Sequence, residues 1–184
     1  MNKLIIISGD LASGKSTLAS LLSEKLHIGF LTKDKMKEIL ADDIGFTSRS
    51  ENKRLSNASV NEMIYVFEQL AKVGGDMILE ANFHTMEMGL LYRLVKKYNY
   101  QACLIYLTGD KHLLYERFME RVPTRHPAHL SAGLTESFEN YEEYIDASRS
   151  EDMVFPVNRI DMTDNTPEQT LVQALEILKK EYLI

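Results

Sequence analysis

Hydrophobic and polar positions follow two periods along the chain, and together they predict strands separated by helices. Short apolar runs at residues 4–7, 28–31, 77–79, 100–107 and 158–162 have the length and composition of buried strands. Between these runs, apolar residues recur every three or four positions, which is the spacing of one helix face. Alternating strands and helices are typical of an α/β domain with a parallel sheet covered on both faces.

Two helices have especially clear sequence signals. Apolar side chains repeat at helical spacing from Val60 to Ala71, and a glycine pair at 74–75 ends the pattern. The C-terminal helix begins with a capping box at 166–169 that has proline in its first helical position. The segment 42–56 is polar and follows neither period, so we expect a flexible connector at about residues 42–56.

Length and charge narrow the class of protein. The chain has 184 residues, enough for one α/β domain, and we predict a single domain over 1–184. It carries 21 Lys and Arg against 27 Asp and Glu, and this net charge of −6 argues against an extended nucleic-acid surface. The single cysteine, Cys103, lies in an apolar run and is expected in the core. The N-terminal apolar run is too short for a signal peptide or a membrane span, so we expect a cytoplasmic protein without a membrane-bound part.

A glycine-rich motif, Gly-x-x-x-x-Gly-Lys-Ser, directly follows the first predicted strand and precedes a helix. Gly9 and Gly14 allow the backbone to curl so that its N–H groups face a phosphate chain. Lys15 can reach the β and γ phosphates, the Ser16 hydroxyl can bind Mg²⁺, and the helix N-terminus adds partial positive charge. A surface turn that happens to contain lysine would not need this strand and helix. The motif predicts a nucleotide site formed by Gly9, Asp10, Leu11, Ala12, Ser13, Gly14, Lys15, Ser16 and Thr17.

Charged side chains also follow the second and third predicted strands. Asp34 and Lys37 begin the helix after the second strand, and Glu80 ends the third. Because ligands bind at the carboxyl edge of open parallel sheets, we expect these side chains near the phosphate loop. Asp34 could instead serve only as a first-turn acid that stabilises the helix dipole. A carboxylate that ends a buried strand needs a partner, which favours a site role for Glu80.

Three arginines lie in a segment that prolines interrupt. Arg117 and Arg121 are four residues apart on one predicted helix, and Arg125 follows Pro123. Proline cannot continue the helix, so we expect a loop here, closed by a second helix over about 134–148. The alternative for the first two arginines is a solvated helix face paired with neighbouring glutamates.

With these motifs, the chain resembles the small P-loop kinases related to nucleoside monophosphate kinases. It is particularly similar to the branch that contains chloramphenicol phosphotransferase, zeta toxins and the kinase domain of polynucleotide kinase. Nearly the whole chain has the same order of elements. The resemblance implies an α/β P-loop NTPase three-layer sandwich with a five-stranded parallel sheet, helices on both faces and a helical lid at about 117–148. Lys37 stands where this branch commonly has arginine, and Glu80 where it commonly has aspartate.

The resemblance also implies roles for individual residues, with ATP and Mg²⁺ as cofactors. Asp34 would be the base for the acceptor hydroxyl, and Glu80 would hold the metal or bind the acceptor. The segment after the third strand would form part of the acceptor site. The implied sets are Asp34, Lys15, Arg121 and Arg125 for catalysis; Arg117 with the phosphate loop for the nucleotide; Asp34, Lys37, Glu80, Asn82 and Phe83 for the acceptor; and Ser16 and Glu80 for the metal.

We therefore expect an ATP-dependent kinase that transfers the γ-phosphate to a hydroxyl of a small molecule, such as a nucleoside, an antibiotic or a sugar derivative. Two alternatives stay open: a nucleic-acid 5′-end kinase, and a nucleotide-binding regulatory module with little catalysis. An acceptor-side acid together with a lid favours catalysis, because a nucleotide sensor requires neither. GTP-binding switch proteins carry an Asn-Lys-x-Asp signature, which this sequence lacks.

Overall fold

A five-stranded parallel sheet forms the centre of the fold, with strand order β2-β3-β1-β4-β5. The computed structural model describes residues 1–129, 133–181 and 183–184. In register, Ile7 lies opposite both Glu80 and Ile105, and Thr32 also lies opposite Glu80. The loops after β1, β2 and β3 therefore leave the sheet side by side. The strands are β1 (Lys3–Gly9), β2 (Phe30–Thr32), β3 (Met77–Glu80), β4 (Gln101–Thr108) and β5 (Val157–Asp161).

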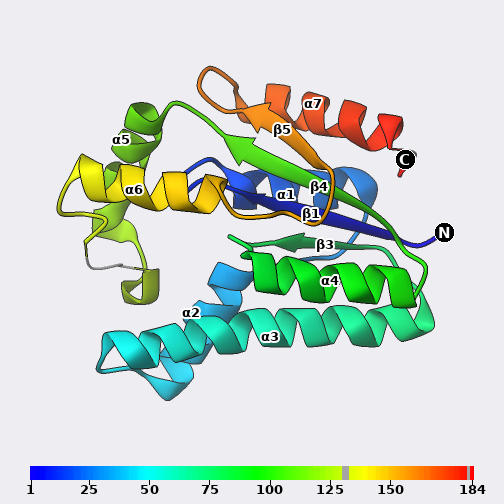
Figure 1. The fold of residues 1–184 in the computed structure, drawn as a ribbon, viewed down its shortest axis with the longest axis horizontal. Helices are drawn as coiled ribbons and strands as arrows, with labels where there is room; N and C mark the ends of the chain where they lie inside the picture. Colours follow the sequence, from blue (N-terminus) through cyan, green and yellow to red (C-terminus); the bar gives the residue numbers. More distant parts are fainter. Residues whose placement is uncertain (130–132, 182) are drawn as a thin grey trace.

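Helices cover both faces of the sheet, as the alternating pattern predicted (Figure 1). One face packs against α1 (Lys15–Leu26) and α7 (Pro167–Lys180), and the other against α3 (Arg49–Val73) and α4 (Thr85–Lys97). The remaining helices gather toward the carboxyl edge of the strands, away from the two termini. They are α2 (Lys33–Ile44), α5 (Lys111–Arg121), α6 (Phe138–Arg149) and the short 3₁₀ helices η1 (Val122–Thr124) and η2 (Pro127–His129).

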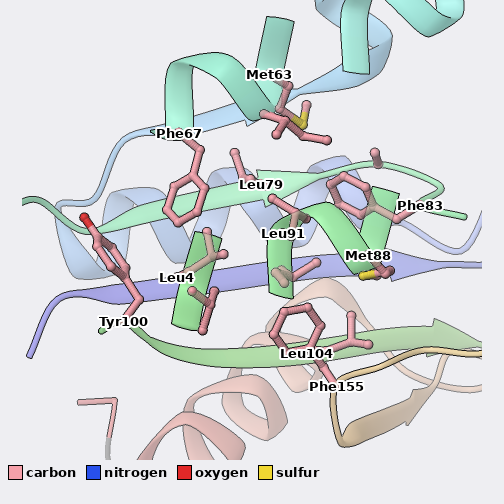
Figure 2. Packing of buried hydrophobic residues seen from close by; sticks show 14 of the residues in the cluster. Leu4, Met63, Phe67, Leu79, Phe83, Met88, Leu91, Tyr100, Leu104 and Phe155 are labelled. Carbon is pink, nitrogen blue, oxygen red and sulfur yellow. The ribbon is translucent and has the colours of Figure 1, made fainter. Parts of the chain in front are cut away.

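The core on the α3 and α4 side shows why the strands are apolar throughout. Leu4 and Leu104 project from the sheet into a layer with Phe67 of α3 and Leu91 of α4 (Figure 2). The rings of Phe67 and Tyr100 meet edge to face with centroids 5.3 Å apart, a favourable arrangement for aromatic pairs. Neighbouring strand residues point to the opposite face, where they pack against α1 and α7. Because both faces are covered, the central strands have few polar positions.

The prediction of a flexible connector over 42–56 was wrong. Helix α2 continues to Ile44 and α3 begins at Arg49, so that only residues 45–48 lie between them. The Ser48 side chain accepts a hydrogen bond from the backbone N–H of Glu51, which caps α3. Leu55 then packs with apolar residues of α2 and η2. The Ser48 cap and the packing of Leu55 stabilise the first turns of α3, which hydrophobic periodicity alone does not reveal.

The segment predicted as a lid, about 117–148, contains the end of α5, both 3₁₀ helices and most of α6. Pro123 lies just after α5, in agreement with the expected interruption. The closing helix begins at Phe138 rather than Leu134, because Ser137 provides the cap. Part of the predicted loop, residues 130–132, lies outside the described residues. In the part of the chain that the structure describes, no helix has the length and apolar character needed to cross a membrane.

Candidate active site

The phosphate loop, residues 9–17, connects β1 to α1 and depends on both of its glycines. Gly9 has a φ of +134°, and a Cβ added there would lie 2.1 Å from the carbonyl oxygen of Leu107 in β4. Gly14 has a φ of 89° and is the N-cap of α1. A side chain is therefore excluded at Gly9 by space and disfavoured at both positions by backbone conformation. The loop enters the helix with its free N–H groups at the carboxyl edge of the sheet.

Lys15 lies inside this loop. Its Nζ donates hydrogen bonds to the backbone carbonyls of Gly9 (3.1 Å) and Asp10 (2.6 Å). Burial lowers the pKa of Lys15, and the nearby carboxylates of Glu80 and Asp34 oppose this effect. The ammonium is thus removed from water, and the two carbonyls replace only part of its lost hydration. Such a group gains from contact with an anion such as a phosphate.

Ser16 and Glu80 meet at the entrance of α1. The Ser16 hydroxyl donates to Glu80 Oε2 over 3.1 Å, although the two residues are 64 positions apart. Glu80 is 4% exposed, and this burial raises the pKa of its carboxyl group, whereas the charge of Lys15 lowers it. Hydroxyl and carboxylate oxygens are ligands that Mg²⁺ prefers. The structure therefore places both residues predicted as metal ligands next to each other, in front of the loop.

A cavity of about 270 Å³ opens beside the phosphate loop. It combines the loop with residues from α2, from the end of β3 and the turn after it, from α3, and from the lid segment. Most residues predicted for catalysis or for the acceptor share this cavity, although they come from distant parts of the sequence. These lining residues are Lys15, Ser16, Asp34, Lys37, Glu80, Asn82, Arg121 and Arg125.

Asp34 faces the lid segment. Its Oδ2 lies 3.7 Å from Nη2 of Arg125, and its Oδ1 lies 3.7 Å from Nδ1 of His129. The guanidinium of Arg125 is also placed over the ring of Phe118, 5.4 Å from its centroid. The side chain of Asp34 is 54% exposed, so it remains accessible from the cavity. Asp34 and Glu80 thus present two carboxylates with contrasting surroundings in one cavity.

The structure corrects the assignment of Phe83 to the acceptor site. Phe83 is 2% exposed and packs in the core with Met88 and Leu91 of α4 (Figure 2). Its backbone N–H bonds to the hydroxyl of Ser8, which holds the turn after β3 against β1. Asn82 does line the cavity, and its amide donates to the hydroxyl of Tyr144 over 2.9 Å. Sequence alone did not show which of these two neighbours faced the sheet core.

The structure also corrects the assignment of Asp10 to the nucleotide site. Its backbone N–H donates to the carbonyl of Leu107, so this group does not point at the phosphate position. Its fully buried carboxylate accepts hydrogen bonds from Arg149 and Thr108 instead. Within the phosphate loop, Asp10 therefore has a structural role. Sequence reasoning did not single out Arg149, and no local spacing connects it with a residue 139 positions earlier.

Arg117 lies beside a second cavity of about 190 Å³ on the other side of the phosphate loop. Its guanidinium donates to the carbonyls of Met162 (2.9 Å) and Thr163 (3.4 Å), in the turn between β5 and α7. Arg121 lines both cavities, and its guanidinium makes no hydrogen bond or ion pair among the described residues. Arg117 is thus close to the predicted nucleotide site but already engaged with the backbone, whereas Arg121 has its donors available.

Several cavity residues were not predicted as site residues. Ser56 of α3, His129 of η2 and Tyr144 of α6 all line the 270 Å³ cavity. Their side chains are polar, but each lies on an element whose position relative to the phosphate loop depends on tertiary packing. His84, just before α4, also lines the cavity, and it belongs to the segment after β3 that was expected to form part of the acceptor site.

Solved structures share this fold over nearly the whole chain. A candidate kinase from Chloroflexus aurantiacus is 23% identical, with a TM-score of 0.79 over 96% of this chain and 98% of that one. The Deinococcus radiodurans tunicamycin resistance protein is 17% identical, with a TM-score of 0.64 over 100% and 98%. APS kinase from Mycobacterium tuberculosis, solved with AMPPNP and APS, is 16% identical, with a TM-score of 0.63 over 97% and 98%.

These likenesses confirm the predicted α/β P-loop NTPase fold. No curated protein matches the sequence. A family model described as an AAA domain matches residues 4–143, which include the phosphate loop, both carboxylates of the cavity and the beginning of α6. The chain therefore belongs to this AAA domain family.

Proposed function

We propose that the protein is an ATP-dependent kinase that transfers the γ-phosphate to a hydroxyl group of a small molecule. One observation carries the proposal: a single cavity joins Lys15 and Ser16 of the phosphate loop to the exposed carboxylate of Asp34 and the buried carboxylate of Glu80. The similarity in fold to APS kinase, which was solved with AMPPNP, supports ATP as the donor.

The cavity suits the charge changes of phosphoryl transfer. The transferred group passes through a loose transition state, so the protein mainly positions the two oxygens and neutralises negative charge. Lys15 would leave its loop carbonyls to contact the β and γ phosphates, and Arg121 and Arg125 would approach from the lid side. Preorganised hydrogen-bond donors of this kind stabilise the charge of the transition state most where water is excluded.

Ser16 and Glu80 would hold Mg²⁺, because they already bring a hydroxyl and a carboxylate within 3.1 Å of each other. The bound ion would neutralise charge on the phosphate oxygens. Glu80 is suited to this role rather than to proton transfer with the acceptor, since it is buried and in direct contact with the phosphate loop.

Asp34 would be the general base. The acceptor oxygen would attack the γ-phosphorus, the bond between this phosphorus and the bridging oxygen would break to release ADP, and the hydroxyl proton would pass to Asp34. Arg125 and His129 contact both carboxylate oxygens and would orient the group. A base of this kind must reach the acceptor hydroxyl within about 2.6–3.2 Å.

The acceptor class within this proposal follows the resemblance to the chloramphenicol phosphotransferase branch: a nucleoside, an antibiotic or a sugar-like molecule. The tunicamycin resistance protein with the same fold supports an antibiotic among the candidates. The net charge of −6 argues against a nucleic-acid acceptor. An ATP-using enzyme of this kind would act in the cytoplasm.

The test is ATP consumption against a panel of nucleosides, aminoglycosides, amphenicols and sugars, the sugars including sugar acids and sugar phosphates, with an oligonucleotide that has a free 5′-hydroxyl as a further member. Lys15→Ala serves as the inactive control. We expect at least one small alcohol to raise turnover well above the control. Turnover stimulated only by the oligonucleotide at physiological salt would favour a 5′-end kinase. Tight MgATP binding with no stimulated turnover would favour a regulatory module.

A further inference from the structure

Lys37 places a buried positive charge in the wall of the cavity. The residue is 9% exposed, and its Nζ donates a hydrogen bond of 2.6 Å to the backbone carbonyl of Ala128 in η2. In the part of the chain that the structure describes, no carboxylate forms an ion pair with it. Asp34, one turn earlier on α2, is paired with Arg125 and His129 instead.

A single carbonyl does not satisfy this ammonium group. Lysine has three N–H donors, and the bond to Ala128 uses one of them. Burial lowers the pKa of Lys37, the neighbouring charge of Lys33 lowers it further, and the carboxylate of Asp34 opposes this effect. A buried charge is costly unless it is paired. Lys37 lines the cavity, so an anion in the cavity is the partner that would stabilise it.

The other charges of the cavity lead to the same conclusion. Five cationic side chains line it (Lys15, Lys33, Lys37, Arg121 and Arg125), against two carboxylates (Asp34 and Glu80). In the proposed function, the triphosphate engages Lys15 and Arg121 at the phosphate loop, and Glu80 holds the metal. Arg125 is shared between the triphosphate and Asp34, with which it is already paired. Lys33 and Lys37, both on α2, then remain as positive charges that form no ion pair with a carboxylate of the described residues.

We propose that the acceptor is an acidic alcohol, whose carboxylate or phosphate binds Lys37 while its hydroxyl lies at Asp34. This inference rests on the proposed kinase function and adds the chemical class of its acceptor. Residues three apart on a helix have Cβ atoms about 5–6 Å from each other. A small hydroxy acid, a sugar acid or a sugar phosphate spans such a distance. Asn82, Ser56 and His84 provide further polar contacts in the same cavity.

The structure also provides a matched control for the structural contact of Lys37. The carbonyl of Ala128 accepts a second hydrogen bond from Nδ2 of Asn52, at 3.1 Å. Asn52→Ala removes this bond to Ala128 and keeps the charge of Lys37. Lys37→Met removes the other bond together with the charge, and Lys37→Arg keeps a charge. If Lys37 only held η2 in place, the asparagine and methionine variants would behave alike.

The experiment is an NMR titration of ¹⁵N-labelled protein saturated with Mg·AMPPNP, so that the phosphate loop is occupied. Inorganic phosphate and malonate are the probes, with chloride used to hold the ionic strength constant. We expect saturable shifts of the Lys37 and Ala128 amides, and the probe with the lower Kd identifies the preferred acidic group. Lys37→Met should raise that Kd at least about tenfold, whereas Lys37→Arg and Asn52→Ala should change it less than about threefold.

Two results would overturn the inference: no saturable shift with either anion, or equal Kd values in the wild type and Lys37→Met. A comparable loss of binding in Asn52→Ala would assign the effect to the position of η2 and would also overturn it. Binding of Mg·AMPPNP is measured first. Failure of the nucleotide to bind contradicts the proposed function, whereas normal nucleotide binding without anion binding contradicts only the acidic acceptor.

Discussion

Arg149, the last residue of α6, donates hydrogen bonds to both carboxylate oxygens of Asp10 in the phosphate loop. Its Nε lies 3.2 Å from Oδ1, and its Nη2 lies 2.5 Å from Oδ2. The same guanidinium donates to the carbonyl of Gly109 at the end of β4. This contact connects α6, the helix at the end of the lid segment, directly to the phosphate loop. The carboxylate that Arg149 binds there is completely buried.

Arg149→Leu should destabilise the protein by about 3 kcal/mol, because it leaves the buried carboxylate of Asp10 without its partner. Urea unfolding measures the loss. Arg93→Leu is the control, since Arg93 is exposed on α4 and its replacement should change the free energy of unfolding by no more than about 0.5 kcal/mol. A loss in Arg149→Leu no larger than in the control would show that the pair has little structural importance.

Lys15→Ala should abolish detectable MgATP binding and leave the fold intact. The hydrogen bonds of Lys15 go only to carbonyls of its own loop, so its loss removes no contact between elements. Isothermal titration calorimetry with MgATP measures the effect, and circular dichroism checks the fold. Lys25→Ala, an exposed lysine at the other end of α1, should bind MgATP normally. Wild-type affinity in Lys15→Ala would rule out the assigned role.

The two carboxylates of the cavity should have separable roles. Asp34→Asn should retain nucleotide and acceptor binding but lower the transfer rate by about 10²–10⁴. Glu80→Gln should mainly raise the Mg²⁺ requirement, because Glu80 contacts Ser16. Pre-steady-state transfer at saturating Mg²⁺ and acceptor distinguishes them. Normal chemistry in Asp34→Asn together with a loss in Glu80→Gln would reverse the assignment and make Glu80 the base.

The docking of η2 onto α2 should weaken as the pH falls. Burial lowers the pKa of His129 below its ordinary value of 6.5, although the nearby acids Asp34 and Glu38 oppose this effect. Arg125 and Lys37 also face the ring and disfavour its protonation. Because the unfolded chain binds this proton more readily, the stabilising contribution is present above about pH 6.5 and decreases as the pH falls through the folded pKa.

Urea unfolding at about pH 7, 6 and 5 tests this dependence. His129→Gln should show a smaller loss of unfolding free energy over this range than the wild type. His27→Asn should retain the wild-type slope, because His27 is exposed at the end of α1 and asparagine tolerates its left-handed backbone. Identical slopes in the wild type and His129→Gln would contradict the prediction.

Within the lid segment, residues 121–134 should be the part that closes over bound substrates. Its described part contacts α2 and α3 through polar bonds, among them those of Lys37 and Asn52 to Ala128, and through a small apolar cluster that Ala128 forms with Ala41 and Leu55. We expect its amide hydrogens to exchange rapidly in the free protein and more slowly with a bisubstrate mimic. Amides of β4 provide the reference, since both neighbouring strands protect them. Unchanged exchange in the segment would argue against closure.

The fold and the location of the site were accessible from sequence because their signals are local. The β-branched run of β1, the glycines of the phosphate loop and the cap of α7 each act within a few residues. Parallel strands bring their carboxyl ends to one edge, so the position of a residue after a strand indicates that it lies near the site. Asp34 and Glu80 were placed in the cavity region by this reasoning.

Contacts between distant segments could not be predicted in the same way. Arg149 and Asp10 are 139 positions apart, and Lys37 and Ala128 are 91 apart. The hydrophobic pattern did not show whether Phe83 faced the cavity, because strand alternation ends before this turn and the bond of its N–H to Ser8 determines the direction.

The order of elements, the parallel sheet and the phosphate loop could be inferred from the sequence alone, since these follow from local backbone preferences and from periodic burial. The pairing of charges, in contrast, depends on the tertiary structure. It gave the buried carboxylate of Asp10 an arginine partner, placed Arg125 and His129 at Asp34, and left Lys37 with a carbonyl as its partner. The energy of a charge depends on its burial and on its nearest opposite charge, and both are set by packing between segments far apart in the chain.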